Sequence, residues 1–203
     1  MITLTLPDGS TRDVEAPLTG AEFAASISNS LAKKALALKL DGVLVDLATE
    51  IDRDCELAVI TADDEEGVEL MRHDCAHVMA QAVQELFPDT QVTIGPVIED
   101  GFFYDFARET PFSLDDLETI EKRMRDIVER NEPIVREVRQ RDEAIAHFRE
   151  IGEIYKAEII SDIPGDEPIT VYRQGDWKDL CRGPHLPSTG KLGKGFKLTQ
   201  LAG

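Results

Sequence analysis

The stretch ALALKLDGVLVDL, residues 35–47, places two apolar runs on either side of Asp41-Gly42. Asp-Gly is one of the strongest short signals for a two-residue hairpin turn, because both central residues of that turn need a positive φ. We therefore expect antiparallel strands at 35–40 and 43–47. This hairpin is the centre of the predicted N-terminal fold.

The residues around this hairpin predict the rest of the first domain. Thr19 and Glu22 have the spacing of a capping box, which opens a short helix. Further strands are expected at 2–6, 11–16 and 56–60. The order β-β-α-β-β-β within residues 1–61 predicts a ubiquitin-like β-grasp domain.

The remaining residues predict a second domain of class α+β. Residues 62–67 are acidic and have no apolar period, so we interpret them as a linker before a domain at 68–203. Helices are expected at 69–87, 113–131, 142–151 and 155–160, and strands at 91–98, 101–106, 134–140 and 169–173, with a last strand that runs from Trp177 into a Gly-Pro turn. Mixed elements in this order indicate an α+β domain with a mainly antiparallel sheet.

Acidic residues dominate the composition. The 203 residues include 40 Asp plus Glu and 22 Lys plus Arg, which gives a formal net charge of −18. This charge argues against a stand-alone nucleic-acid binder, which would show a basic surface. No apolar run reaches the roughly 18–20 residues of a membrane span, and the N-terminus is not a secretion signal. We therefore expect no membrane partner. The three cysteines, an odd number, indicate a reducing, cytoplasmic location.

Two pairs of metal-binding or catalytic side chains stand out. His73 and His77 are four residues apart on a predicted helix, so they share a face. Cys181 and His185 have the same spacing across a Gly-Pro turn. If the pairs meet, three imidazoles and a thiol converge. By residue type this is a tetrahedral zinc site, and equally a metal-free hydrolytic pocket.

Other enzyme classes fit the sequence poorly. A zinc protease needs Glu directly after its first His, where this chain has Asp74. We find no convincing further ligands for an HD-type phosphohydrolase. No P-loop, nucleotide-binding glycine motif or serine nucleophile elbow is present, so nothing in the chain activates ATP. Taken singly, Tyr104, Lys156 and Asp179 are better explained by ordinary structural roles.

Four motifs together resemble the N-terminal region of bacterial threonyl-tRNA synthetases. They are His73-Asp74-Cys75-Ala76-His77, 94–98, 101–105 and Asp179-Leu180-Cys181-Arg182-Gly183-Pro184-His185. The resemblance covers the whole chain and implies a TGS domain at 1–61 and an editing domain at 68–203. The class II aminoacylation core is absent, so no aminoacylation is expected from this chain.

The resemblance implies an aminoacyl-tRNA deacylase that proofreads. Serine differs from threonine by one methyl group, which gives a single site only about 10–200-fold discrimination. A second site that admits serine and excludes threonine supplies the rest. We therefore expect hydrolysis of the ester that joins serine to the tRNA for threonine.

The resemblance also implies roles for individual residues. His73 is the first candidate to orient or deprotonate water or to contact the ribose, and Lys156 to steady the oxyanion or hold the water. The catalytic pocket is completed by His77, Cys181 and His185. The residues expected to bind the substrate are Gly95, Pro96, Tyr104, Asp179 and Arg182.

The resemblance also implies cofactors and partners. We expect editing without a metal, with zinc at the His/Cys cluster as the alternative, and with ATP and a further zinc confined to the missing core. The expected partners are the aminoacylated 3′ end of the tRNA, bound weakly at a charge of −18, and the serine moiety. The full-length enzyme is expected to be a homodimer through the missing regions.

Two other functions remain open. One is a zinc-dependent hydrolase of a non-tRNA ester, which stoichiometric zinc and inhibition by a chelator would indicate. The other is a non-enzymatic TGS regulatory module, although such proteins carry a GTP site or a nucleotidyltransferase domain that is not visible here. Selective loss of the seryl ester from tRNA separates editing from both.

Overall fold

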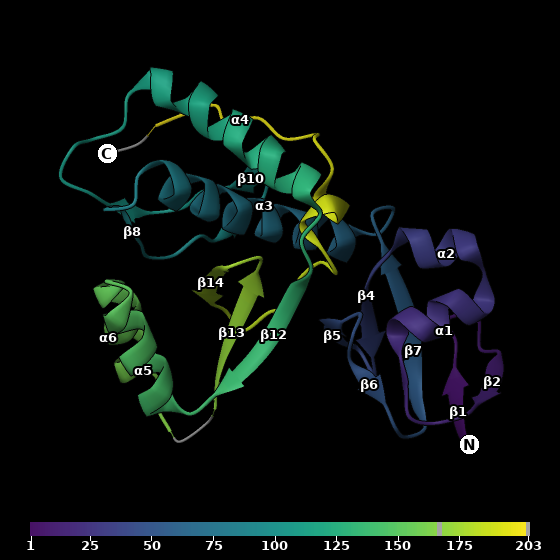
Figure 1. The fold of residues 1–203 in the computed structure, drawn as a ribbon. Coiled ribbons are helices and arrows are strands. Elements are labelled where there is room, and N and C mark those ends of the chain that lie inside the picture. The colour runs from purple at the N-terminus through teal and green to yellow at the C-terminus, as the bar shows by residue number, and fades with distance from the viewer. Residues whose placement is uncertain (166–167, 202–203) are drawn as a thin grey trace. The chain divides into compact units, whose positions relative to one another are not determined.

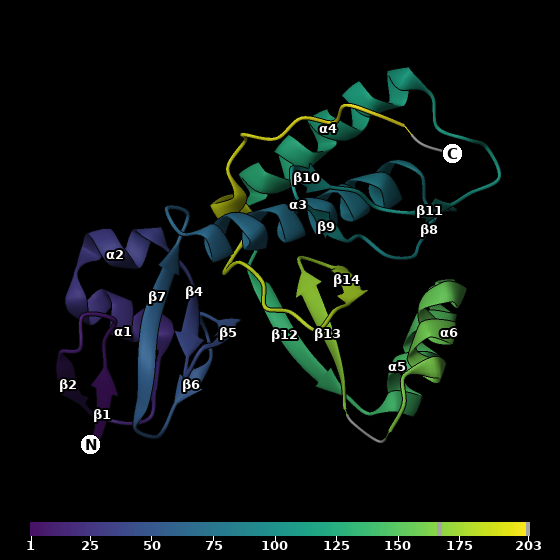
Figure 2. The same ribbon diagram turned by 180° about the vertical axis from the view of Figure 1, so that it is seen from behind.

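The computed structural model describes residues 1–165 and 168–201. The chain divides into two compact units, Met1–Met71 with Gly183–Pro187, and Arg72–Arg182 with Ser188–Gly203. Figures 1 and 2 show the elements of each unit from opposite sides. None of the helices in the described ranges has both the length and the apolar character that a membrane span requires.

The first unit is the predicted β-grasp domain. Its sheet has the order β2-β1-β7-β4-β5, in which β1 and β7 are parallel and the other neighbours antiparallel. The strands are β1 (Ile2–Thr5), β2 (Thr11–Val14), β4 (Ala35–Leu40), β5 (Val43–Asp46) and β7 (Cys55–Thr61). Phe23 of α1 (Gly20–Ile27) packs with the core residues Leu4, Leu38 and Leu57 of the sheet.

The hairpin turn and the helix cap that local sequence patterns predict are both present in this unit. Asp41 and Gly42 both have positive φ, 47° and 84°, as the hairpin between β4 and β5 requires. The N–H of Thr19 donates to the Glu22 carboxylate, and the N–H of Glu22 donates back to the Thr19 hydroxyl. Three further elements were not predicted, namely α2 (Asn29–Lys34) and the paired two-residue strands β3 (Leu18–Thr19) and β6 (Glu50–Ile51).

Helix α3 (Glu65–Leu86) begins earlier than predicted, inside the segment that we interpreted as a linker. Gly67 belongs to its first turn, where a Cβ atom would collide with the carbonyl oxygen of Thr61. The glycine therefore reflects close packing of the chain and not flexibility. Acidic residues in this turn favour the positive end of the helix dipole.

The second unit has class α+β, as predicted. Three antiparallel strands, in the order β12-β13-β14, pack against two helices through a core that contains Phe148, Ile160 and Val171. The strands are β12 (Ile134–Arg139), β13 (Ile169–Gln174) and β14 (Trp177–Leu180), and the two helices are α5 (Arg141–Glu150) and α6 (Ile154–Asp162). The second unit also contains the helix α4 (Leu114–Arg130) and the 3₁₀ turn η1 (Thr189–Leu192).

The predicted hairpin at 91–106 is present but divided into two short ladders. β8 (Gln91–Val92) pairs with β11 (Phe106–Ala107), and β9 (Val97–Ile98) pairs with β10 (Gly101–Phe102). Pro96 lies between the ladders and has no N–H to donate to a partner strand. The segment 93–96 therefore leaves the regular pairing.

Candidate functional site

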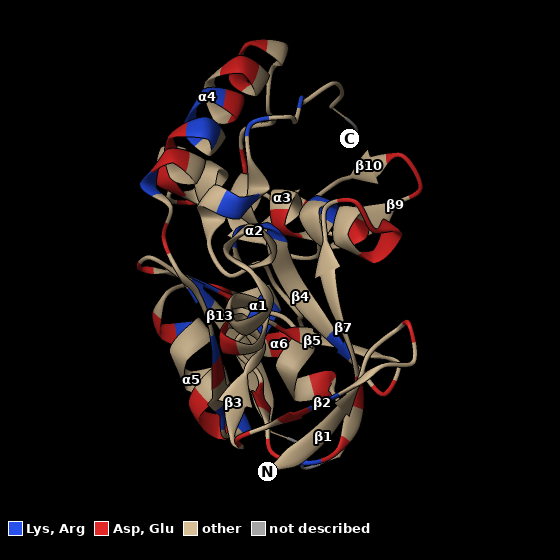
Figure 3. Cartoon of the chain, turned by 90° about the vertical axis from the view of Figure 1, so that its right-hand side faces the viewer, with Lys and Arg blue, Asp and Glu red and all other residues tan. Residues whose placement is uncertain are grey.

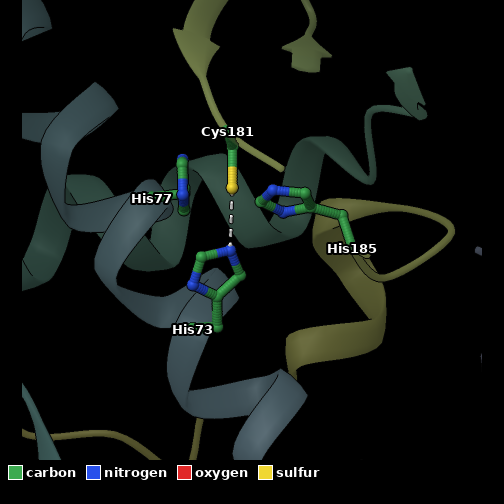
Figure 4. A group of neighbouring side chains, drawn as sticks. All are labelled: His73, His77, Cys181 and His185. Atoms are coloured by element: carbon green, nitrogen blue, oxygen red, sulfur yellow. Dashed lines mark hydrogen bonds between the residues drawn. The ribbon is translucent and has the colours of Figure 1, made fainter. Parts of the chain in front are cut away.

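The two predicted pairs come together in one group of side chains. His73, His77, Cys181 and His185 each offer a ligand atom, and these atoms all lie within 4.8 Å of one another. Figure 4 shows the three imidazole rings arranged around the Cys181 thiol. His73 Nε2 lies 3.2 Å from Cys181 Sγ, and the rings of His73 and His77 are 4.7 Å apart on successive turns of α3.

Asp179 is the centre of a hydrogen-bonded network beside this group. Its side chain is buried, with 0% of the residue exposed. Lys156 Nζ lies 2.6 Å from Oδ1, and the Leu180 N–H donates to the same oxygen. The Tyr104 hydroxyl donates to Oδ2 at 2.8 Å, and His77 Nδ1 lies 3.2 Å from Oδ2. These contacts engage both oxygens of the carboxylate.

The contact with Asp179 defines the orientation of the His77 ring. A carboxylate next to Nδ1 favours the tautomer in which Nδ1 carries the proton. Nε2 then has a lone pair that can accept a proton or bind a metal. His77 is buried while His73 is half-buried, so His73 is the more accessible of the two imidazoles.

Lys156 is also buried, with 3% of the residue exposed. Besides its ion pair with Asp179, its ammonium donates to the Tyr104 hydroxyl at 3.1 Å. Burial, followed by the charge of Asp179, raises the pKa of Tyr104, so its hydroxyl stays protonated and can donate to that carboxylate. The three side chains hold one another in a single arrangement.

Gly95 is required where the loop 93–96 passes over Tyr104. A Cβ atom at this position would overlap the Tyr104 ring. Backbone bonds from Asp105 N to Ile94 O, at 2.9 Å, and from Phe103 N to Pro96 O, at 3.3 Å, hold the loop in place. Contact of Gly95 and Pro96 with a ligand stays a prediction, and so does the role of Arg182, whose side chain is exposed.

Three residues that the sequence reasoning did not place at the site lie behind this network. The Trp177 indole donates to Gln84 Oε1 at 2.6 Å, and Gln84 Nε2 donates to the Glu153 carboxylate. Val92 N donates to Glu153 Oε2 at 3.1 Å. The Trp177 ring also lies 6.0 Å from that of His77. No sequence signal pointed to Gln84 or Glu153.

The four side chains of the group fit a zinc ion by type, since imidazole nitrogen and thiolate sulfur are its usual ligands. The carboxylate of Asp179 behind His77 is the kind of outer partner that metal-binding histidines have. If all four ligated, they would fill the tetrahedral shell and leave no open position for water. The arrangement therefore fits a structural zinc ion better than a catalytic one.

Comparison with known proteins finds family matches near each end of the chain and relatives over its whole length. Residues 2–61 match the TGS domain, and residues 169–202 match the "Threonyl and Alanyl tRNA synthetase second additional domain". The whole chain is 66% identical to a threonine–tRNA ligase of Parvibaculum lavamentivorans, 62% to one of Rhodospirillum rubrum and 63% to one of Thiobacillus denitrificans. It covers 31%, 32% and 32% of the length of these relatives, respectively.

Proposed function

We propose that this chain, the counterpart of the N-terminal region of threonine–tRNA ligases, hydrolyses the ester between serine and the tRNA for threonine. The observation that carries the proposal is the ordered network around Asp179, which holds His77, Lys156 and Tyr104 next to the more accessible His73. A cluster of imidazoles of which His73 is half-buried, beside a buried ammonium, is the chemistry that ester hydrolysis needs. The TGS and synthetase-domain matches support tRNA as the carrier of the ester.

In this proposal His73 receives the proton of the attacking water or contacts the ribose hydroxyl. Imidazole is the side chain best suited to proton transfer near neutral pH, and the exposure of His73 lets it touch the substrate. Lys156 keeps a fixed positive charge near the carbonyl, where negative charge develops in the transition state. Because Asp179 already has several donors, we assign it to positioning His77 and Lys156 rather than to binding the substrate ammonium.

The acidic character of the chain predicts weak binding of tRNA. Figure 3 marks acidic residues in red on both α4 and α5, and the net charge is −18. Phosphate contacts dominate the affinity for nucleic acids, and salt weakens them. We therefore propose that deacylation by this chain alone is slow and depends strongly on salt. We place this activity in the cytoplasm. In threonine–tRNA ligases such as those compared above, of which the chain covers 31% and 32%, we propose that the remaining regions supply further tRNA contacts, dimerisation and aminoacylation.

The test is to incubate the chain with seryl-tRNA and threonyl-tRNA, both made on the tRNA for threonine. The proposal expects selective loss of the seryl ester. Equal loss of both esters, or no turnover of either at enzyme concentrations above that of the tRNA, contradicts it. No turnover would favour the regulatory-module alternative.

A second candidate is a zinc-dependent hydrolase of another ester, in which three of the four potential metal ligands bind zinc and water takes the fourth position. Elemental analysis of protein purified without added metal separates the two. Editing without metal expects substoichiometric zinc and a seryl-tRNA deacylation rate that a chelator does not change. One zinc per chain, with activity on a non-tRNA ester that the chelator abolishes, would support the second candidate.

A further inference from the structure

We propose that three residues form a positioning layer behind the site, which sets the geometry of the site residues. The positioning layer is Gln84, Glu153 and Trp177, and the site residues that it positions are His77, Lys156 and Asp179. This inference rests on the proposed deacylase function for one of its readouts, and a second readout does not depend on activity.

Each member of the positioning layer shares an element and a face with one site residue. Gln84 follows His77 by seven residues, which is two turns of α3. Glu153 is the N-cap of α6, and Lys156 lies one turn further along it. On β14, Trp177 precedes Asp179 by two residues, so both side chains point to the same side of the strand. The layer therefore connects the three elements that carry the site.

The hydrogen bonds of the positioning layer have a fixed direction. The Trp177 indole can only donate, so the oxygen of the Gln84 amide must face it, at 2.6 Å. The nitrogen of that amide then donates to the Glu153 carboxylate and to the carbonyl oxygen of Thr90, the latter at 3.0 Å. The other carboxylate oxygen accepts the N–H of Val92. Reversing the Gln84 amide would set two donors against each other at Trp177 and two acceptors against each other at Glu153.

Burial of the Glu153 carboxylate costs free energy unless hydrogen bonds compensate it. Only 5% of it is exposed, and burial raises the pKa of its carboxyl group above the ordinary value. Although it is the N-cap residue of α6, its side chain makes no cap hydrogen bond and instead reaches α3 and β8. Its carboxylate thus fixes the start of α6, and with it the direction in which Lys156 leaves the helix.

A polarity swap tests the positioning layer. In Glu153→Gln, the new amide can accept from Val92, but its NH₂ group faces the NH₂ of Gln84. In Gln84→Glu, two carboxylates face each other. In the double variant, the carboxylate introduced at position 84 would accept from Trp177 and from the amide introduced at position 153, so every bond returns except the one to Thr90. We expect each single variant to lower kcat for seryl-tRNA about tenfold with KM nearly unchanged, and the double variant to recover most of the loss.

The matched control is Arg130→Met. Arg130 makes two hydrogen bonds to Glu85, at 2.7 and 2.8 Å, and Glu85 is the neighbour of Gln84 on α3. This variant removes a tertiary contact of the same helix without touching the positioning layer. We expect a lower Tm but a kcat within about twofold of wild type. Should a single variant fail to fold, Trp177→Phe keeps a smaller aromatic ring and removes the indole donor, and we expect a smaller fall in kcat.

The second readout is the rate at which acetic anhydride acetylates Lys156, followed by mass spectrometry. We expect slow labelling in wild type, severalfold faster labelling in each single variant, and slow labelling again in the double variant. If wild type does not hydrolyse seryl-tRNA but labelling follows this pattern, the proposed function fails and the positioning layer stands. The proposal of a positioning layer would be overturned if Glu153→Gln and Gln84→Glu both had the same kcat and the same rate of Lys156 labelling as wild type.

Discussion

His77 Nδ1 and Asp179 Oδ2 lie 3.2 Å apart in the buried part of the second unit. The same carboxylate binds Lys156 and Tyr104. One acidic side chain thus orients an imidazole, an ammonium and a phenol. The predictions below follow from this relationship and from the packing around it.

Replacing Asp179 with Asn should impair catalysis more than binding. The amide is nearly isosteric, but it removes the negative charge that fixes the His77 tautomer and the Lys156 ammonium. We expect kcat for seryl-tRNA deacylation to fall about 10–100-fold with little change in KM. A variant with unchanged kcat, or one in which only KM rises, would contradict the positioning role of Asp179.

The ion pair between Lys156 and Asp179 should show strong coupling in stability. Removing one partner leaves the other charge buried and unpaired, which costs about 3–5 kcal/mol. Lys156→Met and Asp179→Asn should each lower the free energy of unfolding, measured in urea. The double variant should lose clearly less than the two single losses together, while deacylation stays impaired. Additive losses would mean that the two charges do not stabilise each other.

Gly95 and Gly101 provide a matched pair of glycines. A Cβ atom at Gly95 meets the Tyr104 ring, whereas one at Gly101 has no neighbour within 4 Å. Gly95→Ala should therefore displace Tyr104 from Asp179, lowering both Tm and the deacylation rate. Gly101→Ala should leave both close to wild type, since neither glycine is among those with positive φ. Equal effects of the two substitutions would rule out the packing argument.

Glu85 should contribute to stability only above acidic pH. Its hydrogen bonds with Arg130, the largest cause, and with Arg123 hold its pKa at about 2, against an ordinary value of 4.5. A carboxyl group whose pKa is lower in the folded state stabilises fully above the unfolded pKa and loses that effect as pH falls toward the folded pKa. Tm should therefore fall between about pH 4.5 and about pH 2, and Glu85→Gln should flatten this fall. If the Tm of the variant falls equally steeply with pH, other carboxyl groups cause the loss of stability.

The sequence predicted the features that depend on near neighbours. The Thr19–Glu22 capping box and the Asp41-Gly42 turn are local patterns, and they form as expected. The i,i+4 spacing of His73 and His77 likewise placed both on one face of a helix. Motif spacing also supplied the resemblance, which the comparisons with threonine–tRNA ligases support.

The features that the sequence did not predict depend on contacts between distant residues. Glu153 and Gln84 are 69 positions apart, and nothing in either local sequence distinguishes them from solvated polar residues. The central position of Asp179 in the hydrogen-bonded network likewise depends on a distant residue, since Tyr104, which donates to it, is 75 positions away. Gly67 lies in an acidic, glycine-ended stretch, which is typical of both a linker and a first helical turn, and the structure has it in the first turn of α3. Only the carbonyl of Thr61 shows why glycine is needed there.

The most direct test of the proposed function is the single-turnover rate of seryl-tRNA deacylation by wild type, His73→Ala and Lys156→Ala. The proposal predicts a measurable wild-type rate and a loss of about 10²–10⁴-fold in His73→Ala, with a large loss in Lys156→Ala as well. Circular dichroism would confirm that each variant is folded. Wild-type rates in both folded variants would contradict the assignment of the catalytic site.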